Sequence, residues 1–129
     1  MQVTGTFTVS MAPLDAYAPA TEGTTQGRMS LDKTFSGPLT ASSKGEMLTA
    51  MTSTKGSAGY VAIEKVQGTL EGKEGTFVLQ HFGIMHGTES RLILEVVPAS
   101  GTGELVGLSG KMDICNEDGV HHYDFTYEL

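Results

Sequence analysis

The sequence predicts an all-β protein, folded as a closed eight-stranded antiparallel barrel in a single domain over residues 1–129. Apolar residues recur at every second position, which is the period of a strand with one face on a core. Glycine-centred turns divide the chain at even spacing, and no stretch accumulates the three apolar turns of a helix. About eight strands is the size at which a barrel fills with its own side chains or holds one small ligand.

The strand pattern is clearest at the two ends of the chain. Val3, Phe7 and Val9 alternate with polar residues in the first strand, and alternation returns over residues 28–35. The closing segment 121–129 alternates in the same way. The segment from Leu14 to Thr25 has no pattern and is expected to be a loop or excursion.

Glycine marks the expected turns between the strands. They are predicted near residues 36–38, 44–45, 55–56, 68–75, 86–87, 100–103 and 118–119. Asp118-Gly119 is the strongest of these signals, because a type I′ hairpin turn requires positive φ at both central residues. No helix follows the glycine-rich segments and no phosphate-loop motif occurs, so these glycines indicate turns and bulges.

Two central strands are apolar on both faces, which predicts that both faces are covered. They contain residues 60–63 and residues 77–79 with Phe82. A barrel covers only the inner face, so the outer face of these strands requires another subunit. If Tyr60 faces inward, Val61 and Ile63 face outward, and they are the residues through which we expect a homo-oligomer. The alternative is scattered exposed apolar residues, which are common in monomers.

Charge and cysteine content exclude several classes of partner. Eight Lys and Arg stand against 15 Asp and Glu, for a net charge of −7, which disfavours binding to nucleic acid or to an anionic membrane. Cys115 is the single cysteine, so no internal disulfide can form, and no basic neighbour is present to activate it. The first ten residues lack the apolar segment of a signal peptide or membrane span. We expect a cytoplasmic protein without a cofactor.

The histidines do not have the spacing of a metal site. His81 and His86 are five residues apart, and His121 and His122 are adjacent, so within one strand each pair points to opposite faces. A metal site would need His81, one of the C-terminal pair and a carboxylate to converge across strands. No metal is therefore expected.

Glu64 is the first candidate for chemistry, because it shares a strand face with Tyr60 and Ala62. A carboxylate on an inner face is costly unless paired, and such a group often has a raised pKa suited to acid–base work. The alternative is that Glu64 lies in water at the barrel mouth or pairs with a cation. The candidate cations are Lys33, Lys65 and Arg91.

His81 is the second candidate, on the strand that follows Glu64 along the chain. Neighbouring antiparallel strands bring facing side chains within about 5 Å, so His81 and Glu64 can meet if both point inward. His81 shares its face with Phe77 and Leu79, which suit a core, whereas Gln80 points to the other face. The sequence favours His81 as the inward residue but leaves Gln80 open.

Five segments resemble a bacterial family of domains of unknown function. They are GEMLTA (45–50), GSAGYVAIE (56–64), GTFVLQHFG (75–83), EVVPASGTGEL (95–105) and HHYDFTYEL (121–129). Members of that family are small barrels similar in fold to plant allene oxide cyclases. The resemblance implies an eight-stranded antiparallel barrel and no established activity.

The similarity to the cyclases themselves extends to a few positions. AGYVAIEKV (58–66) is similar to a cyclase strand on which a pocket cysteine occupies the position of Tyr60. The pocket asparagine of the cyclases corresponds to a position near Asp32. Their catalytic glutamate on the first strand has no counterpart, since the inward positions are Phe7, Val9 and Met11. The resemblance therefore implies a pocket of altered polarity.

These observations predict a barrel that binds a small, partly apolar molecule in its interior. The expected lining residues are Phe7, Val9, Asp32, Tyr60, Glu64, His81, His121, Tyr123 and Phe125. One alternative is an isomerase or cyclase-type enzyme in which Glu64 or His81 moves protons and Tyr60 orients the substrate. A second alternative is a filled barrel that acts only as an oligomeric interaction module.

Overall fold

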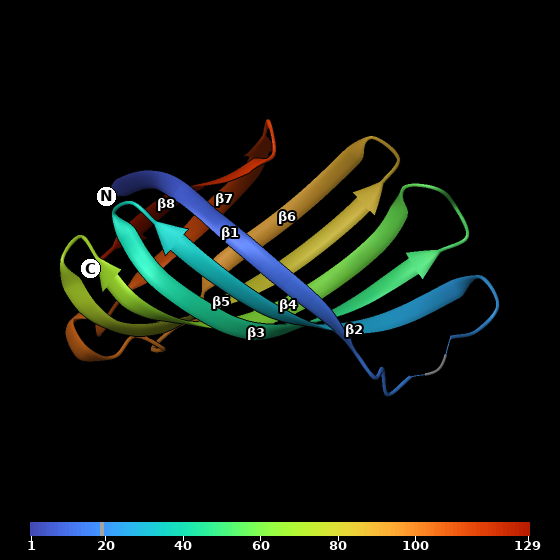
Figure 1. Ribbon diagram of the computed structural model, residues 1–129, viewed down its shortest axis with the longest axis horizontal. Helices are drawn as coiled ribbons and strands as arrows, with labels where there is room; N and C mark the ends of the chain where they lie inside the picture. The colour runs from blue at the N-terminus through green and yellow to red at the C-terminus, as the bar shows by residue number, and fades with distance from the viewer. Residues whose placement is uncertain (19) are drawn as a thin grey trace.

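The computed structural model describes residues 1–18 and 20–129, which form one closed antiparallel barrel of eight strands (Figure 1). The strands are β1 (Gln2–Leu14), β2 (Thr24–Ser36), β3 (Leu39–Thr52), β4 (Ser57–Leu70), β5 (Lys73–His86), β6 (Glu89–Val96), β7 (Ser109–Glu117) and β8 (Val120–Glu128), and a 3-10 turn, η1 (Gly103–Leu105), lies between β6 and β7. Each strand pairs with its neighbour in the chain, and β8 closes the barrel on β1. The predicted fold class is confirmed. The described residues contain no helix long and apolar enough to cross a bilayer.

Most predicted turns are confirmed. Asp118 and Gly119 have φ of 51° and 80°, as a type I′ turn requires. The turn predicted within 68–75 is the two-residue connection Glu71-Gly72, again with both φ values positive. The unpatterned segment separates β1 from β2 as expected; Pro19, which falls within it, lies outside the described residues.

The turn predicted at Lys44-Gly45 is wrong, because both residues lie inside β3. Gly45 is directly opposite Glu64 in the register. A Cβ atom at position 45 would come within 2.2 Å of the Ile63 carbonyl oxygen and 2.7 Å of the Glu64 Cα. Glycine is needed here because the two strands approach closely. In the sequence alone, a glycine that permits such an approach cannot be distinguished from a glycine in a turn.

One half of the barrel, the closed half, is filled by a packed apolar core. Its members are inward-facing residues of all eight strands together with two leucines from the β6–β7 connection. They are Phe7, Phe35, Leu39, Ala41, Val66, Leu70, Phe77, Leu79, Leu94, Val96, Leu105, Leu108, Met112, Tyr123, Phe125 and Tyr127. The β6–β7 connection is held across this end, because the Thr102 N–H donates to the Thr76 carbonyl at 2.8 Å.

The other half, the open half, lacks this closure. β6 and β7 pair only at Glu95–Lys111, and the β1–β8 pairing ends at Phe7–His121. Beyond these points β1 to β6 continue as one ladder, and the tip of the β7–β8 hairpin stands apart from β6 (Figure 1). Inward-facing Met11 and Met85 are 50% and 43% exposed in this half, so the inner face is open to solvent here.

Candidate functional site

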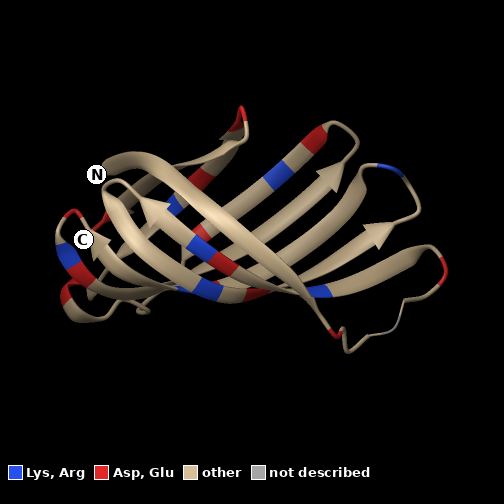
Figure 2. Ribbon diagram, viewed as in Figure 1, with Lys and Arg blue, Asp and Glu red and all other residues tan. Residues whose placement is uncertain are grey.

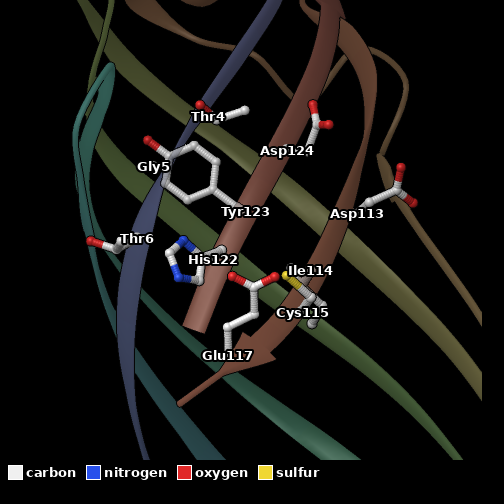
Figure 3. A pocket seen from close by; sticks show the side chains of 10 residues that line it. All are labelled: Thr4, Gly5, Thr6, Asp113, Ile114, Cys115, Glu117, His122, Tyr123 and Asp124. Atoms are coloured by element: carbon white, nitrogen blue, oxygen red, sulfur yellow. The ribbon is translucent and has the colours of Figure 1, made fainter. Parts of the chain in front are cut away.

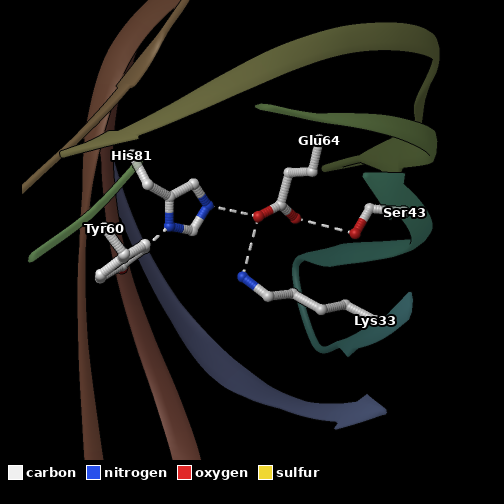
Figure 4. A network of polar contacts seen from close by, with 5 residues as sticks. All are labelled: Lys33, Ser43, Tyr60, Glu64 and His81. Atoms are coloured by element: carbon white, nitrogen blue, oxygen red, sulfur yellow. Dashed lines mark hydrogen bonds and ion pairs between the residues drawn. The ribbon is translucent and has the colours of Figure 1, made fainter. Parts of the chain in front are cut away.

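A buried charged network lies inside the barrel where the closed half meets the open half (Figure 4). Its centre is the Glu64 carboxylate on β4. The Lys33 Nζ on β2 donates to Glu64 Oε2 at 2.9 Å, and the Ser43 Oγ on β3 donates to Glu64 Oε1 at 2.8 Å. The His81 Nε2 on β5 is a third partner, at Oε2. Side chains from three strands, β2, β3 and β5, therefore converge on one carboxylate of β4.

The network is removed from water. Glu64 is 0% exposed, and Lys33, Ser43 and His81 are buried as well. Burial alone raises the pKa of Glu64, but the hydrogen bond from His81 and the charge of Lys33 outweigh it and lower that pKa from 4.5 to about 2. Glu64 is therefore a carboxylate at neutral pH. The expectation of a raised pKa at this residue is wrong, because the sequence did not reveal how many donors converge on it.

His81 connects this carboxylate to Tyr60. A carboxylate can only accept, so His81 Nε2–H is the donor to Glu64, and the other ring nitrogen, Nδ1, faces Tyr60. The Tyr60 Oη lies 3.3 Å from His81 Nδ1. Burial, followed by the charge of Glu64, raises the pKa of Tyr60, so its hydroxyl stays protonated. Tyr60 is half-buried and forms the side of the network nearest to the open half.

A glycine on β5 positions the Tyr60 ring. Gly83 is directly opposite Tyr60 in the register, and a Cβ atom at position 83 would lie 2.3 Å from Tyr60 Cε1. The ring therefore lies across bare backbone, in the arrangement by which an aromatic side chain covers a strand glycine. This contact directs the hydroxyl toward His81.

The structure brings the three candidate residues for chemistry together. Tyr60, Glu64 and His81 all face inward, and Gln80 faces outward. The prediction that His81 and Glu64 meet is confirmed, and so is the alternative in which Glu64 pairs with Lys33. Both hold because a carboxylate oxygen can accept from two donors at once.

Asp32 is not part of this site, and its expected interior contact is wrong. Its carboxylate lies on the outer surface, where it accepts from Lys44 Nζ at 2.8 Å. The period of two places its neighbours Leu31 and Lys33 inside, so Asp32 must face outward. Lys33 occupies the interior position that the resemblance assigned to Asp32.

The other predicted lining residues lie inside the barrel but away from the open half. Phe7, Tyr123 and Phe125 are buried in the closed-half core. Val9 packs against that core, and the half-buried His121 ring stacks on Phe7 with centroids 5.1 Å apart. Of these residues, Phe7 borders the charged network, because the Lys33 Nζ lies over its ring.

Ser43 was missed by sequence reasoning, and Lys33 was considered only as a partner of Glu64. Leu39, Ala41 and Ser43 alternate with exposed residues, so the strand period alone could have placed Ser43 inside. The same period places Lys33, between Leu31 and Phe35, on the inner face, but a lysine is rarely buried unless it is paired. Lys33 is tolerated because its ammonium group pairs with Glu64 and lies 5.0 Å from the centre of the Phe7 ring.

A second hollow, of about 460 Å³, lies along β1, β7 and β8 (Figure 3). Its lining residues are Thr4, Gly5, Thr6, Asp113, Ile114, Cys115, Glu117, His122, Tyr123 and Asp124. Within residues 1–18 and 20–129, no group of three or more His, Cys, Asp or Glu side chains is placed to hold a metal ion. The hollow has three carboxylates and no lysine or arginine, so it does not suit an anionic ligand.

The fold and the site define a class: a closed antiparallel eight-stranded barrel with a paired, buried charged layer between a filled half and an open half. The sequence profile of the DUF3224 family, proteins of unknown function, matches residues 3–127, and the chain belongs to that family. It is similar to a DUF3224 protein of unknown function from Shewanella oneidensis MR-1, solved as a crystal structure at 1.84 Å resolution. The two share 58% identity with a TM-score of 0.98, over 100% of this chain and 96% of the other. No curated protein matches this chain in sequence.

Proposed function

We propose that this protein binds a small, partly apolar molecule in the open half of the barrel, above the charged network. The observation that carries the proposal is that apolar side chains facing inward in this half are exposed to solvent. A packed interior leaves few such side chains uncovered. A bound molecule would cover them.

Methionines dominate the proposed lining. Met29 and Met47 are half-buried and lie in one register row with Ala62 and His81, all on the inner face. Met85 lies further toward the opening, and Met11, opposite Leu31 on β1, is 50% exposed. Methionine side chains are flexible and polarisable, so they can adapt to ligands of different outline.

The polar contact in this proposal is the Tyr60 hydroxyl. It lies at the boundary between the lining and the charged network, and it is held in place by His81. Ligand sites usually combine an apolar lining with a few fixed polar groups that orient the ligand. Tyr60 can accept from a ligand donor while its proton is directed to His81.

The test is the binding of Nile red, a neutral apolar dye, followed by fluorescence. Met47→Gln places a polar amide in the proposed lining and should weaken binding by roughly ten-fold, as expected when an apolar contact is lost. The matched control is Leu48→Gln, because Leu48 is the next residue of β3 and faces outward with 56% exposure. Weaker binding to Leu48→Gln with unchanged binding to Met47→Gln would place the dye on the outer surface and contradict the proposal.

Native mass spectrometry of the protein after mild purification provides an independent test. A molecule that co-purifies with the wild type and is depleted in Met47→Gln would identify the ligand. A cytoplasmic location is also part of this proposal, and it is supported by the single free cysteine, Cys115, since paired cysteines are typical of oxidising compartments.

A second candidate function is acid–base isomerisation, and the continuous Tyr60–His81–Glu64 chain favours it. Glu64 fixes the ring of His81, and His81 can take or return a proton through the Tyr60 hydroxyl to a bound carbonyl compound. The test is hydrogen–deuterium exchange at the carbons next to the carbonyl of 2-octanone in D2O, followed by NMR. Exchange catalysed by the wild type and lost in His81→Gln supports this function, whereas equal exchange in both excludes it. The similarity to allene oxide cyclases stays a prediction.

A further inference from the structure

The outer face of the barrel has a continuous apolar stripe across four strands. Leu48, Val61, Phe82 and Ile93 are directly opposite one another in the register, one from each of β3, β4, β5 and β6. Ile63 and Ile84 extend the stripe on the two central strands. All six face outward, and their exposure ranges from 38% to 56%. An apolar patch that crosses four strands is unusual on a monomer and typical of an interaction surface.

The charges around the stripe are nearly balanced. The central strand segments 57–63 and 75–86 have no Lys, Arg, Asp or Glu, as Figure 2 shows for β4 and β5. The charged residues next to the stripe in the register are Arg28, Glu46, Lys65, Arg91 and Glu95. These are three basic and two acidic residues, so the rest of the chain has five basic and 13 acidic residues. Two copies would repel each other through most of their surface but not through this face.

The stripe has a hollow at one side and an aromatic ring next to it. A hollow of about 570 Å³ lies beside the stripe and is lined by Arg28, Glu46, Leu48, Val61, Ala62, Ile63 and Gln80. The Phe82 ring on the adjacent strand stands beside it, with Arg91 5.5 Å above the ring centre. One surface therefore presents both an aromatic ring and a mainly apolar hollow, and a two-fold axis through this surface would bring the ring of each copy to the hollow of the other.

We propose that this face is the contact between two copies of the chain, related by a two-fold axis that runs parallel to the strands between β4 and β5. Such an axis reverses the order of the stripe. It places Val61 against Phe82 of the second copy, and Leu48 against Ile93 of the second copy. The same axis places Glu46 opposite Glu95 of the second copy, with Arg28, the ion-pair partner of Glu46, beside the two carboxylates.

The experiment is sedimentation velocity on the full chain at a concentration of about 0.1 mM, at which even a micromolar dimer is populated. The wild type should sediment at twice the 13.6 kDa mass of one chain. Val61→Glu should sediment as a monomer, because the buried unpaired charge occurs twice in a two-fold contact and each occurrence weakens the contact by roughly a hundred-fold. Far-UV circular dichroism and the urea midpoint check that each variant is folded.

The matched control is Val120→Glu. Val120 is 46% exposed and Val61 is 47% exposed, but Val120 lies at the start of β8, away from the stripe. The control should remain a dimer. A wild type that is monomeric, or a Val61→Glu protein that is folded and dimeric, overturns the proposal. Loss of the dimer in Val120→Glu alone also overturns it.

A mixing experiment tests the pairing across the axis. Phe82→Lys alone should also be monomeric. When it is mixed with Val61→Glu, the carboxylate introduced at position 61 of one chain should meet the ammonium group introduced at position 82 of the other, while the second contact keeps its wild-type residues. The mixture should then form a heterodimer. A mixture that remains monomeric, while each variant is folded, overturns this geometry. The readout is mass, so failure here is distinct from failure of dye binding.

Discussion

The closed half and the open half are built from the same strands, yet their interiors differ. On β5, Phe77 is 1% exposed in the closed half, whereas Met85, on the same face, is 43% exposed in the open half. The difference lies in the partners, because eight strands and the β6–β7 connection surround Phe77, while the β7–β8 hairpin has left β6 near Met85. Inward direction therefore does not by itself produce burial.

The charged network marks the boundary between these halves. A buried ion is tolerated only when it is paired and hydrogen-bonded. Glu64 meets that condition with Lys33, Ser43 and His81, and every buried side-chain nitrogen and oxygen among the described residues has a partner. The comparison teaches that the closed half provides stability and fixes the polar groups that the open half presents.

The largest expected effect on stability comes from removing the central carboxylate of the charged network. Glu64→Ala removes the carboxylate and leaves Lys33 buried without its ion-pair partner, so it should cost about 3–5 kcal/mol of the free energy of unfolding. Urea denaturation measures it. The control is Asp32→Ala, which removes a carboxylate from the outer face of the same barrel and should leave the urea midpoint unchanged. Equal losses in the two variants would show that the network has no special role.

A loss of stability of similar size is expected when a side chain is truncated in the closed half but not in the open half. Phe125→Ala creates a cavity in the closed half, where Phe125 is 0% exposed, and should cost about 3–5 kcal/mol. Met85→Ala in the open half should cost about 0.5 kcal/mol or less, because Met85 is already 43% exposed. Thermal and urea unfolding of both variants measure the difference. A large loss for Met85→Ala would mean that the open half is packed in solution.

Acid unfolding should depend on Glu64. Its pKa is lowered on folding from 4.5 to about 2, so the unfolded state binds more protons between these values. The resulting stability, about 3 kcal/mol, is present above about pH 4.5 and is lost as the pH falls through about 2. Glu64→Gln should flatten the acid limb of the curve of stability against pH. Glu46→Gln, which changes an exposed carboxylate on β3, should leave that limb in place.

The smallest expected effects on stability come from removing two tyrosine hydroxyls, one in each half. The Tyr123 hydroxyl in the closed half accepts from the Leu39 N–H and donates to the Ser36 carbonyl, both at 3.0 Å. Tyr123→Phe leaves buried groups unpaired and should cost about 1–3 kcal/mol. Tyr60→Phe removes one long contact beside the open half and should cost about 1 kcal/mol or less. The reverse order in urea denaturation would place Tyr60 in the structural core.

The sequence by itself determined the fold class and the inner face of most strands. A period of two in polar and apolar residues is local information, and it correctly placed Tyr60, Glu64 and His81 inside and Val61 and Ile63 outside. The Asp118-Gly119 turn was also readable, because positive φ at two consecutive residues is a local requirement.

Only the tertiary structure decided how far each inward residue is buried and what it contacts. Strand period gives the face but not the position along the barrel axis, so it could not separate the packed Phe125 from the exposed Met85. It offered His81 and Lys33 as separate possible partners of Glu64 but could not show that both meet it together with Ser43, because that depends on the register between strands. Whether Gly45 lies in a turn or at a close approach of two strands also depends on this register. Its role is set by the strand opposite it, which lies about twenty residues further along the chain.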